Sequence, residues 1–268
     1  MIQLSVLAAY RREAQTEKTC SELDGRGGAA RLGLKRTLFY SAPLRALDKM
    51  VRPKGWALVS RQGPQGGGND FRWMIENLNP HEDALLFEDD VQPCVNAVDM
   101  MVRTKVPDDC GAVSFYDAGD TVGNLYAGMR TGLHKIVPSG ANALGFHGAQ
   151  ALRLPAWLIA RMQDGEFDPP HVGQDVWVGR LLHGIGKKIA VMCPSLVQHV
   201  GDDSLCSPGA KLTGARVPAA NFPGENFDAM GVWPDVIQSG GWTAREKITW
   251  CELHGMHHAD AIVCSRVA

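Results

Sequence analysis

Short apolar runs alternate along most of the chain with stretches whose apolar residues recur at helical spacing. The apolar runs predict strands at residues 2–8, 37–40, 56–60, 84–87, 112–116, 143–147, 189–192 and 196–200. The helical spacing predicts helices at residues 12–23, 69–78, 149–162 and 175–183. Strands that alternate with helices are typical of βαβ units, whose strands pair side by side in parallel. We therefore expect an α/β protein with a mixed, mainly parallel, Rossmann-like sheet flanked by helices.

Two stretches break this pattern. The run from Arg61 to Gly68 contains four glycines and a proline, and we expect a loop there because consecutive glycines populate positive φ and resist regular structure. After about Ser204 the chain becomes rich in Gly, Pro and Ala, and its periodicity fades. We expect a long loop or lid over residues 205–240. The predicted organisation is one domain over residues 1–204 and a lid with a C-terminal tail over residues 205–268.

Composition and charge exclude several classes of protein. The chain has 268 residues, of which 45% are hydrophobic and 21% charged, so disordered, collagen-like and coiled-coil proteins are excluded. Its 27 basic and 29 acidic residues give a net charge of −2, which is not the footprint of a protein basic all over its surface. No apolar stretch reaches the ~18–20 residues of a membrane span, and the apolar start lacks the basic region of a signal peptide. Seven cysteines at scattered spacing fit a reducing compartment, so we expect a cytoplasmic protein without a transmembrane segment.

Three consecutive acids, Glu88, Asp89 and Asp90, directly follow the apolar run 84–87. Open parallel sheets bind ligands at the carboxyl ends of their strands, and hard divalent cations prefer carboxylate oxygens. Because side chains alternate along an extended segment, Glu88 and Asp90 are expected on one side and Asp89 on the other. The triplet therefore indicates a site for a metal bound to a diphosphate. The alternative is a solvated acidic turn that caps the next helix.

The segment Leu85–Pro93 resembles the acidic metal-binding motif of glycosyltransferases with the GT-A fold. It is close to the Leu-Glu-Asp-Asp form of bacterial lipopolysaccharide-type enzymes. Further segments resemble the same family in the same order, and together they span roughly residues 2–204: residues 9–12, 61–71, 173–177 and 194–201. The resemblance implies a GT-A-like fold and a nucleotide-sugar-dependent glycosyltransferase of the hexosyltransferase type.

The resemblance also implies roles for individual residues. Asp90 and His199 would bind Mn2+ or Mg2+, with Glu88 and Asp89 near the ribose or the water shell of the metal. A histidine beside hard oxygen ligands suits Mn2+. The alternative for His199 is an ordinary strand histidine that is hydrogen-bonded in the core.

Asp175 matches the position of the catalytic base of inverting members, although Asp is also a preferred N-cap. Tyr10, Arg12 and Arg61 would contact the donor. The two arginines could pair with its diphosphate, because a guanidinium fork matches diphosphate oxygens. A UDP-sugar is the favoured donor. Each of the three could equally be an ordinary surface or core-edge residue. Trp177 could form a platform for the acceptor or could be an ordinary packing residue.

The C-terminal tail carries a second group of metal-ligand types. Its members are compatible with a tetrahedral structural Zn2+ and are Cys251, His254, His258 and Cys264. The alternative is a segment with free thiols and incidental histidines.

Several functions stay open at this point. For a glycosyltransferase, the expected acceptor is a glycan or small molecule; the alternative acceptor is a hydroxymethylated base of phage-type modified DNA. Phosphate contacts to such DNA would come from a local basic stripe, formed by Arg11, Arg12, Lys18, Arg31, Lys35 and Arg36, or by Lys187 and Lys188. A second alternative is a divalent-metal phosphoesterase or nuclease, which would want a second metal site. A non-catalytic binding module would leave the acidic triplet unexplained.

Overall fold

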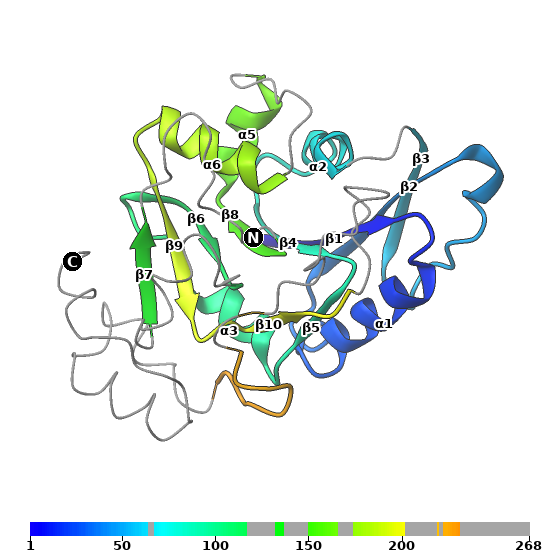
Figure 1. The fold of residues 1–268 in the computed structure, drawn as a ribbon, viewed down its shortest axis with the longest axis horizontal. Helices are drawn as coiled ribbons and strands as arrows, with labels where there is room; N and C mark the ends of the chain where they lie inside the picture. The colour runs from blue at the N-terminus through cyan, green and yellow to red at the C-terminus, as the bar shows by residue number, and fades with distance from the viewer. Residues whose placement is uncertain are drawn as a thin grey trace, which may run out of the picture.

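The centre of the protein is one eight-stranded, mainly parallel sheet (Figure 1). The computed structural model describes residues 1–63, 67–116, 132–136, 150–165, 174–201, 219 and 222–230. Across the sheet the strands follow in the order β3 (Ala57–Gln62), β2 (Lys35–Ala42), β1 (Ile2–Ala9), β4 (Asp83–Glu88), β8 (Ala151–Leu154), β6 (Cys110–Ser114), β9 (Lys188–Cys193) and β7 (Gly132–Ile136). Strand β8 runs antiparallel to both of its neighbours, and β7 runs antiparallel to β9. The predicted α/β class and mixed, mainly parallel sheet are confirmed.

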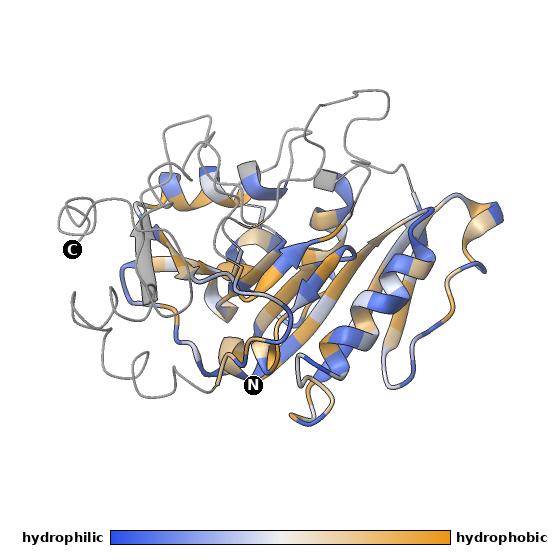
Figure 2. Cartoon of the chain, turned by 60° about the horizontal axis from the view of Figure 1, so that its bottom comes forward, coloured by the Kyte–Doolittle hydropathy of each residue, from blue (hydrophilic) through white to orange (hydrophobic). Residues whose placement is uncertain are grey.

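Helices cover both faces of the sheet, as expected for strands that are apolar on both sides. One face packs against α1 (Glu13–Asp24) and α3 (Ala97–Arg103). The other packs against α2 (Gly67–Glu76), α5 (Ala156–Gln163) and α6 (Gln174–Gly184). A short 3-10 helix, η1 (Leu44–Ala46), follows β2. Figure 2 shows the central strands as hydrophobic and the outer surfaces of the helices as largely hydrophilic. No helix in the described ranges is both long and apolar enough to cross a membrane.

The helix predicted over residues 149–162 is wrong in its first half. Residues Ala151–Leu154 form strand β8 between β4 and β6, and the helix α5 begins only at Ala156. Pro155 lies between them with an extended backbone, at ψ 153°. Proline fits the start of a helix but breaks its interior, so it separates the two elements. All four residues of β8 are buried, which a strand in the middle of a sheet requires.

The loop predicted from Arg61 to Gly68 is also shorter than expected. Strand β3 continues to Gln62 because Arg61 and Gln62 pair with Ser41 and Ala42 of β2. At the other end, α2 already begins at Gly67. The first N–H groups of a helix have no partner within the helix, so glycine disturbs a first turn less than an interior one.

A second, two-stranded sheet was predicted only in part. Strand β10 (Val197–His199) lies in the expected run 196–200, whereas its antiparallel partner β5 (Val91–Pro93) was not anticipated, and neither were α3 and β7. Residues 222–230 pack against the end of β5 in this region, where Ala229 is fully buried and its N–H bonds Val95 O at 2.9 Å. The strand predicted at 143–147 and the Cys/His group of the tail lie outside the described residues.

Candidate metal centre

The acidic triplet and the turn after β1 meet at the carboxyl ends of two neighbouring strands. Strands β1 and β4 are parallel, and their register pairs Leu7 with Glu88. The turn that follows β1 therefore lies beside Asp89 and Asp90. In this turn Arg11 has a φ of 74°, a region that non-glycine residues rarely adopt. Such backbone strain is concentrated at functional sites.

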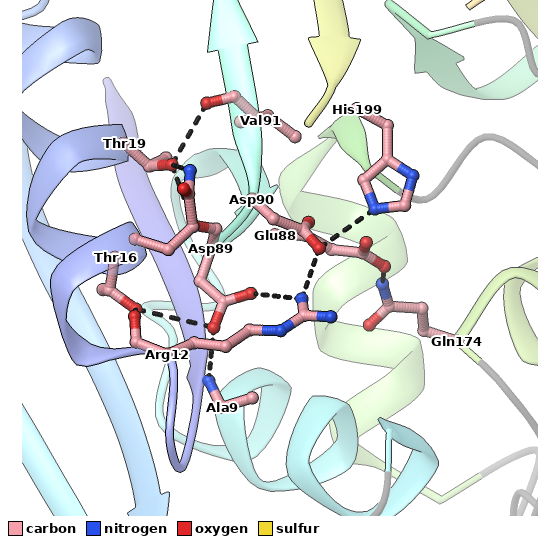
Figure 3. Close-up of polar contacts among 11 residues, drawn as sticks. Ala9, Arg12, Thr16, Thr19, Glu88, Asp89, Asp90, Val91, Gln174 and His199 are labelled. Carbon is pink, nitrogen blue, oxygen red and sulfur yellow. Dashed lines mark hydrogen bonds and ion pairs between the residues drawn. The ribbon is translucent and has the colours of Figure 1, made fainter. Parts of the chain in front are cut away.

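Asp89 points towards α1 and ties the β1–α1 turn together (Figure 3). Its carboxylate accepts the N–H of Ala9 at 2.7 Å and pairs with Arg12 at 3.2 Å. Its backbone carbonyl accepts the Thr19 hydroxyl of α1 at 2.8 Å. The predicted alternation of side chains is thus present, with Asp89 on the opposite side from Glu88 and Asp90.

Strand pairing brings His199 to Asp90. The register of β10 on β5 sets His199 opposite Val91, and its Nε2 lies 2.9 Å from Asp90 Oδ2. The Val200 N–H also donates to the backbone carbonyl of Asp90 at 2.8 Å. The next residue, Gly201, lies so close that a Cβ built on it would be 2.9 Å from Asp90 Cγ and closer still to Oδ2. Sequence reasoning gave Gly201 no role of its own; the signal was a glycine two positions after the candidate ligand.

Glu88, Asp90 and His199 offer a set of ligand atoms that fits a divalent cation. One ligand atom from each lies within 4.8 Å of the other two, and no other such group occurs among the residues that the structure describes. Asp90 is 1% exposed, and its Oδ1 is buried without a hydrogen-bond partner among the described residues. A buried carboxylate oxygen left without a partner is costly, and a cation would satisfy it. Carboxylate oxygens suit both Mn2+ and Mg2+, and an imidazole beside them suits Mn2+ better.

Burial and mutual repulsion also shift the pKa values of the acids at the site. Burial, followed by the charges of Asp90, Asp89 and Asp175, raises the pKa of Glu88 well above its usual value. Burial and the charge of Asp90 raise the pKa of Asp89 to about 7. Burial acts in the same direction on Asp90, but His199 and Arg12 outweigh it and hold the pKa of that carboxyl below its usual value. The charged forms of Glu88 and Asp89 are therefore disfavoured by burial and by the neighbouring acids, and a bound cation would favour those charged forms.

The first turn of α6 adds two residues to this edge of the site. Gln174 is 8% exposed and donates its side-chain amide to Glu88, which fixes the orientation of that carboxylate. Asp175 follows it in the same turn and is close enough for its charge to raise the pKa of Glu88. The predicted base thus lies on the acidic side of the site. Sequence reasoning did not single out Gln174, although it is part of the quoted segment 173–177.

Arg61 and Trp177 make contacts that hold elements of the fold together. Arg61 pairs with Asp70 at 2.8 Å and lies over the Trp73 ring at 4.7 Å, so it joins β3 to α2. Trp177 is 3% exposed and packs edge-on against Phe71, which makes it a packing residue.

Tyr10 lies in the β1–α1 turn and is half-buried. Two basic groups lie near its ring: the Arg11 guanidinium, 5.4 Å from the ring centroid, and the Lys49 ammonium, 5.8 Å from it. A positively charged environment of this kind would suit an anionic ligand that reached the turn.

No protein-family model and no curated protein matches the chain. Among solved structures it is similar to the mannosyltransferase PcManGT from Pyrobaculum calidifontis in complex with GDP-Man and Mn2+, with a TM-score of 0.48 and 14% identity over 70% of this chain and 56% of that one. It is also similar to the galactosyltransferase LgtC in complex with donor and acceptor sugar analogs, with a TM-score of 0.43 and 10% identity over 80% of this chain and 91% of that one. The glycosyltransferase GlyE of Streptococcus pneumoniae TIGR4 gives a TM-score of 0.44 and 11% identity over 97% of this chain and 66% of that one. This chain thus spans about half the length of the mannosyltransferase and about two thirds of GlyE. Identities and TM-scores this low do not indicate a shared function.

Proposed function

We propose that the protein is a metal-dependent glycosyltransferase of the GT-A type, which moves a sugar from a nucleotide-sugar donor to an acceptor hydroxyl. The observation that carries the proposal is the group formed by Glu88, Asp90 and His199, in which a buried Asp90 oxygen has no hydrogen-bond donor within the part of the chain that the structure describes. Asp90 and His199 would hold Mn2+ or Mg2+, with Glu88 beside them. When bound, the cation would act as a Lewis acid and offset the charge that builds on the leaving diphosphate.

The turn between β1 and α1 would hold the donor. Arg12 reaches the acids from this turn, and its planar guanidinium suits diphosphate oxygens. Tyr10 lies two residues earlier and would stack on the nucleobase. A UDP-sugar is our first choice of donor. Arg61 is held by Asp70 and Trp73, so we assign it to the support of α2.

Asp175 would be the base that takes the proton of the acceptor hydroxyl, in a reaction that inverts the anomeric centre. Asp175 lies in the first turn of α6, close enough to Glu88 for its charge to act there, and a carboxylate within hydrogen-bond reach of a hydroxyl can take its proton. Gln174 would keep Glu88 in place beside it. The acceptor proposed first is a glycan or small molecule.

The metal–donor site is tested by thermal unfolding with a panel of UDP-, GDP- and CMP-sugars in the presence of Mn2+. We expect one class of nucleotide sugar to raise the melting temperature of the wild type and of Asp164→Asn, a control that removes one exposed charge after α5. Asp90→Asn should show no such rise and should transfer sugar at least ~100-fold more slowly, because the metal contribution to the transition state is lost.

Circular dichroism would establish that Asp90→Asn is folded. The proposal fails if no nucleotide sugar shifts the melting temperature and Asp90→Asn behaves like the wild type. Cleavage of a model phosphodiester with Mn2+ alone would indicate a phosphoesterase instead. Transfer assays on oligosaccharides and on DNA that contains hydroxymethylcytosine would identify the acceptor class.

A further inference from the structure

Arg12 is the cationic side chain that contacts Asp89 and Asp90 at the candidate metal centre (Figure 3). Its Nη1 forms an ion pair with Asp90 Oδ2 and a second one, of 3.2 Å, with Asp89 Oδ1. The Arg12 side chain is 17% exposed, whereas those of its two partners are almost completely buried. Arg12 is also the residue immediately before α1, so the β1–α1 turn fixes where its side chain starts.

The same oxygen of Asp90 serves two partners. His199 Nε2 contacts Asp90 Oδ2 at 2.9 Å, and Arg12 pairs with this oxygen from the other side. A divalent cation held by Asp90 and His199 would therefore lie within a few ångströms of the guanidinium. Two cations this close repel each other strongly in a buried site, where little water screens them.

The two ion pairs of Arg12 are not equivalent. Asp89 lies outside the Glu88–Asp90–His199 group and is fixed by the Ala9 N–H, so it can keep its contact with the guanidinium when Asp90 is engaged elsewhere. A small rotation of the Arg12 side chain about its contact with Asp89 would release Asp90 and leave the guanidinium paired with Asp89 alone.

We infer that Arg12 is a resident counter-ion of the metal centre, which a divalent cation displaces from Asp90 and which then binds the diphosphate that arrives with that cation. The inference rests on the proposed function and adds a coupling to it. Arg12 opposes a metal that binds alone and favours a metal that binds together with a nucleoside diphosphate, so each ligand increases the affinity of the protein for the other.

The coupling is tested on the full chain by titrating Mn2+ with and without UDP and measuring free Mn2+ by electron paramagnetic resonance. We expect Arg12→Gln to bind Mn2+ alone about tenfold more tightly than the wild type, which is within the usual range of coupling between two ligands. The metal-free variant should melt at a lower temperature, because Asp90 has lost its counter-ion. The increase in Mn2+ affinity that UDP causes in the wild type should largely disappear.

Arg103→Gln is the matched control. It removes the same charge from an exposed arginine that also pairs with an aspartate, Asp99 at 2.7 Å, but lies on α3 and outside the β1–α1 turn. We expect it to bind Mn2+ and UDP like the wild type, so any effect specific to residue 12 stands out from a general change of charge.

The inference is overturned if Arg12→Gln binds Mn2+ alone no more tightly than Arg103→Gln does. In that case the proposed function survives as long as the wild type binds Mn2+ and UDP. If neither the wild type nor Arg12→Gln binds Mn2+, both proposals fail.

A second measurement avoids any variant that folds poorly. The side-chain Nε–H resonance of Arg12 in the wild type, assigned by its absence in Arg12→Lys, should shift when Mg2+ is added and shift again when UDP follows. A resonance that ignores Mg2+ in a protein that binds it would show that Arg12 does not leave Asp90, and would also overturn the inference.

Discussion

The metal centre depends on single contacts that sequence patterns reveal unevenly. The triplet 88–90 and His199 could be identified because acids at a strand end and a histidine in the closing strand have a recognisable order. The ion pairs of Arg12 and the contact of Gln174 could not, since both depend on side-chain directions across elements that are about 80 residues apart in the chain. The role of Gly201 could not be predicted from the sequence either, because only the fold shows that a side chain at this position would overlap Asp90.

Gly201→Ala tests how tightly this centre is packed. The added methyl group would overlap the Asp90 carboxylate, so either Asp90 or β10 has to shift. We expect the substitution to lower the free energy of unfolding by about 1–3 kcal/mol, as overpacking does, and to abolish the Mn2+-dependent rise in melting temperature. Gly33→Ala is the control, because its Cβ meets nothing within 4 Å and its φ is +63°. It should cost about 1 kcal/mol of stability and leave Mn2+ binding intact; a variant at Gly201 that keeps full Mn2+ affinity would contradict the packing argument.

The boundaries of strands could be predicted where an apolar run was short and clearly bounded. They could not be predicted where one continuous apolar pattern covered a strand and the helix that follows it. The strands β1, β2, β4 and β9 agree with the predicted runs to within a few residues. Residues 151–163 kept apolar spacing throughout, and only Pro155 marked the change from strand to helix. All four residues of β8 are buried between β4 and β6, including Arg153, whose charge the apolar spacing of a helix would not have placed inside.

Strand β8 also supports the neighbouring helix α3. Arg153 of β8 donates to the carbonyls of Met101 and Val102 at the end of α3, at 3.2 and 2.9 Å, and pairs with Asp83 of β4 at 2.8 Å. Helix ends leave such carbonyls without partners, and a buried arginine satisfies them. We expect Arg153→Met to lower the free energy of unfolding in urea by about 3–5 kcal/mol, as the loss of one member of a buried ion pair does. Arg103→Met removes an exposed arginine paired with Asp99 and should change stability by less than about 1 kcal/mol. Equal stability of the two variants would show that the bonds to α3 are not needed.

At the scale of the whole molecule, the net charge of −2 was a poor guide to partners, because two of the acids, Glu88 and Asp90, converge with His199 on one centre. The boundary after residue 204 followed from a change in composition, which reports local periodicity and not where a segment packs. Residues 222–230 lie beyond that boundary and yet belong to the same core. Glu225 pairs with Arg26 at 2.7 Å, and Phe227 O accepts the Val95 N–H at 2.9 Å.

A pair of shortened chains would measure what this packing contributes. A chain that ends at residue 204 loses the segment 222–230, and with it the buried Ala229 and the contacts of Phe222, Phe227 and Met230 with the core. At about 25 cal/mol per Å2 of apolar surface, the burial of these side chains amounts to several kcal/mol. We therefore expect the free energy of unfolding of the chain ending at 204 to be at least about 2 kcal/mol lower than that of a chain ending at 230, measured by urea denaturation. The shorter chain should also bind Mn2+ more weakly. The segment 222–230 forms hydrogen bonds with Val95, just after β5, and β5 begins at Val91, the residue after Asp90. Loss of the segment therefore removes support from the strand next to the metal centre. Equal stability of the two chains would support a self-sufficient domain that ends at 204, and the segment 222–230 would then be an accessory to the fold rather than a part of it.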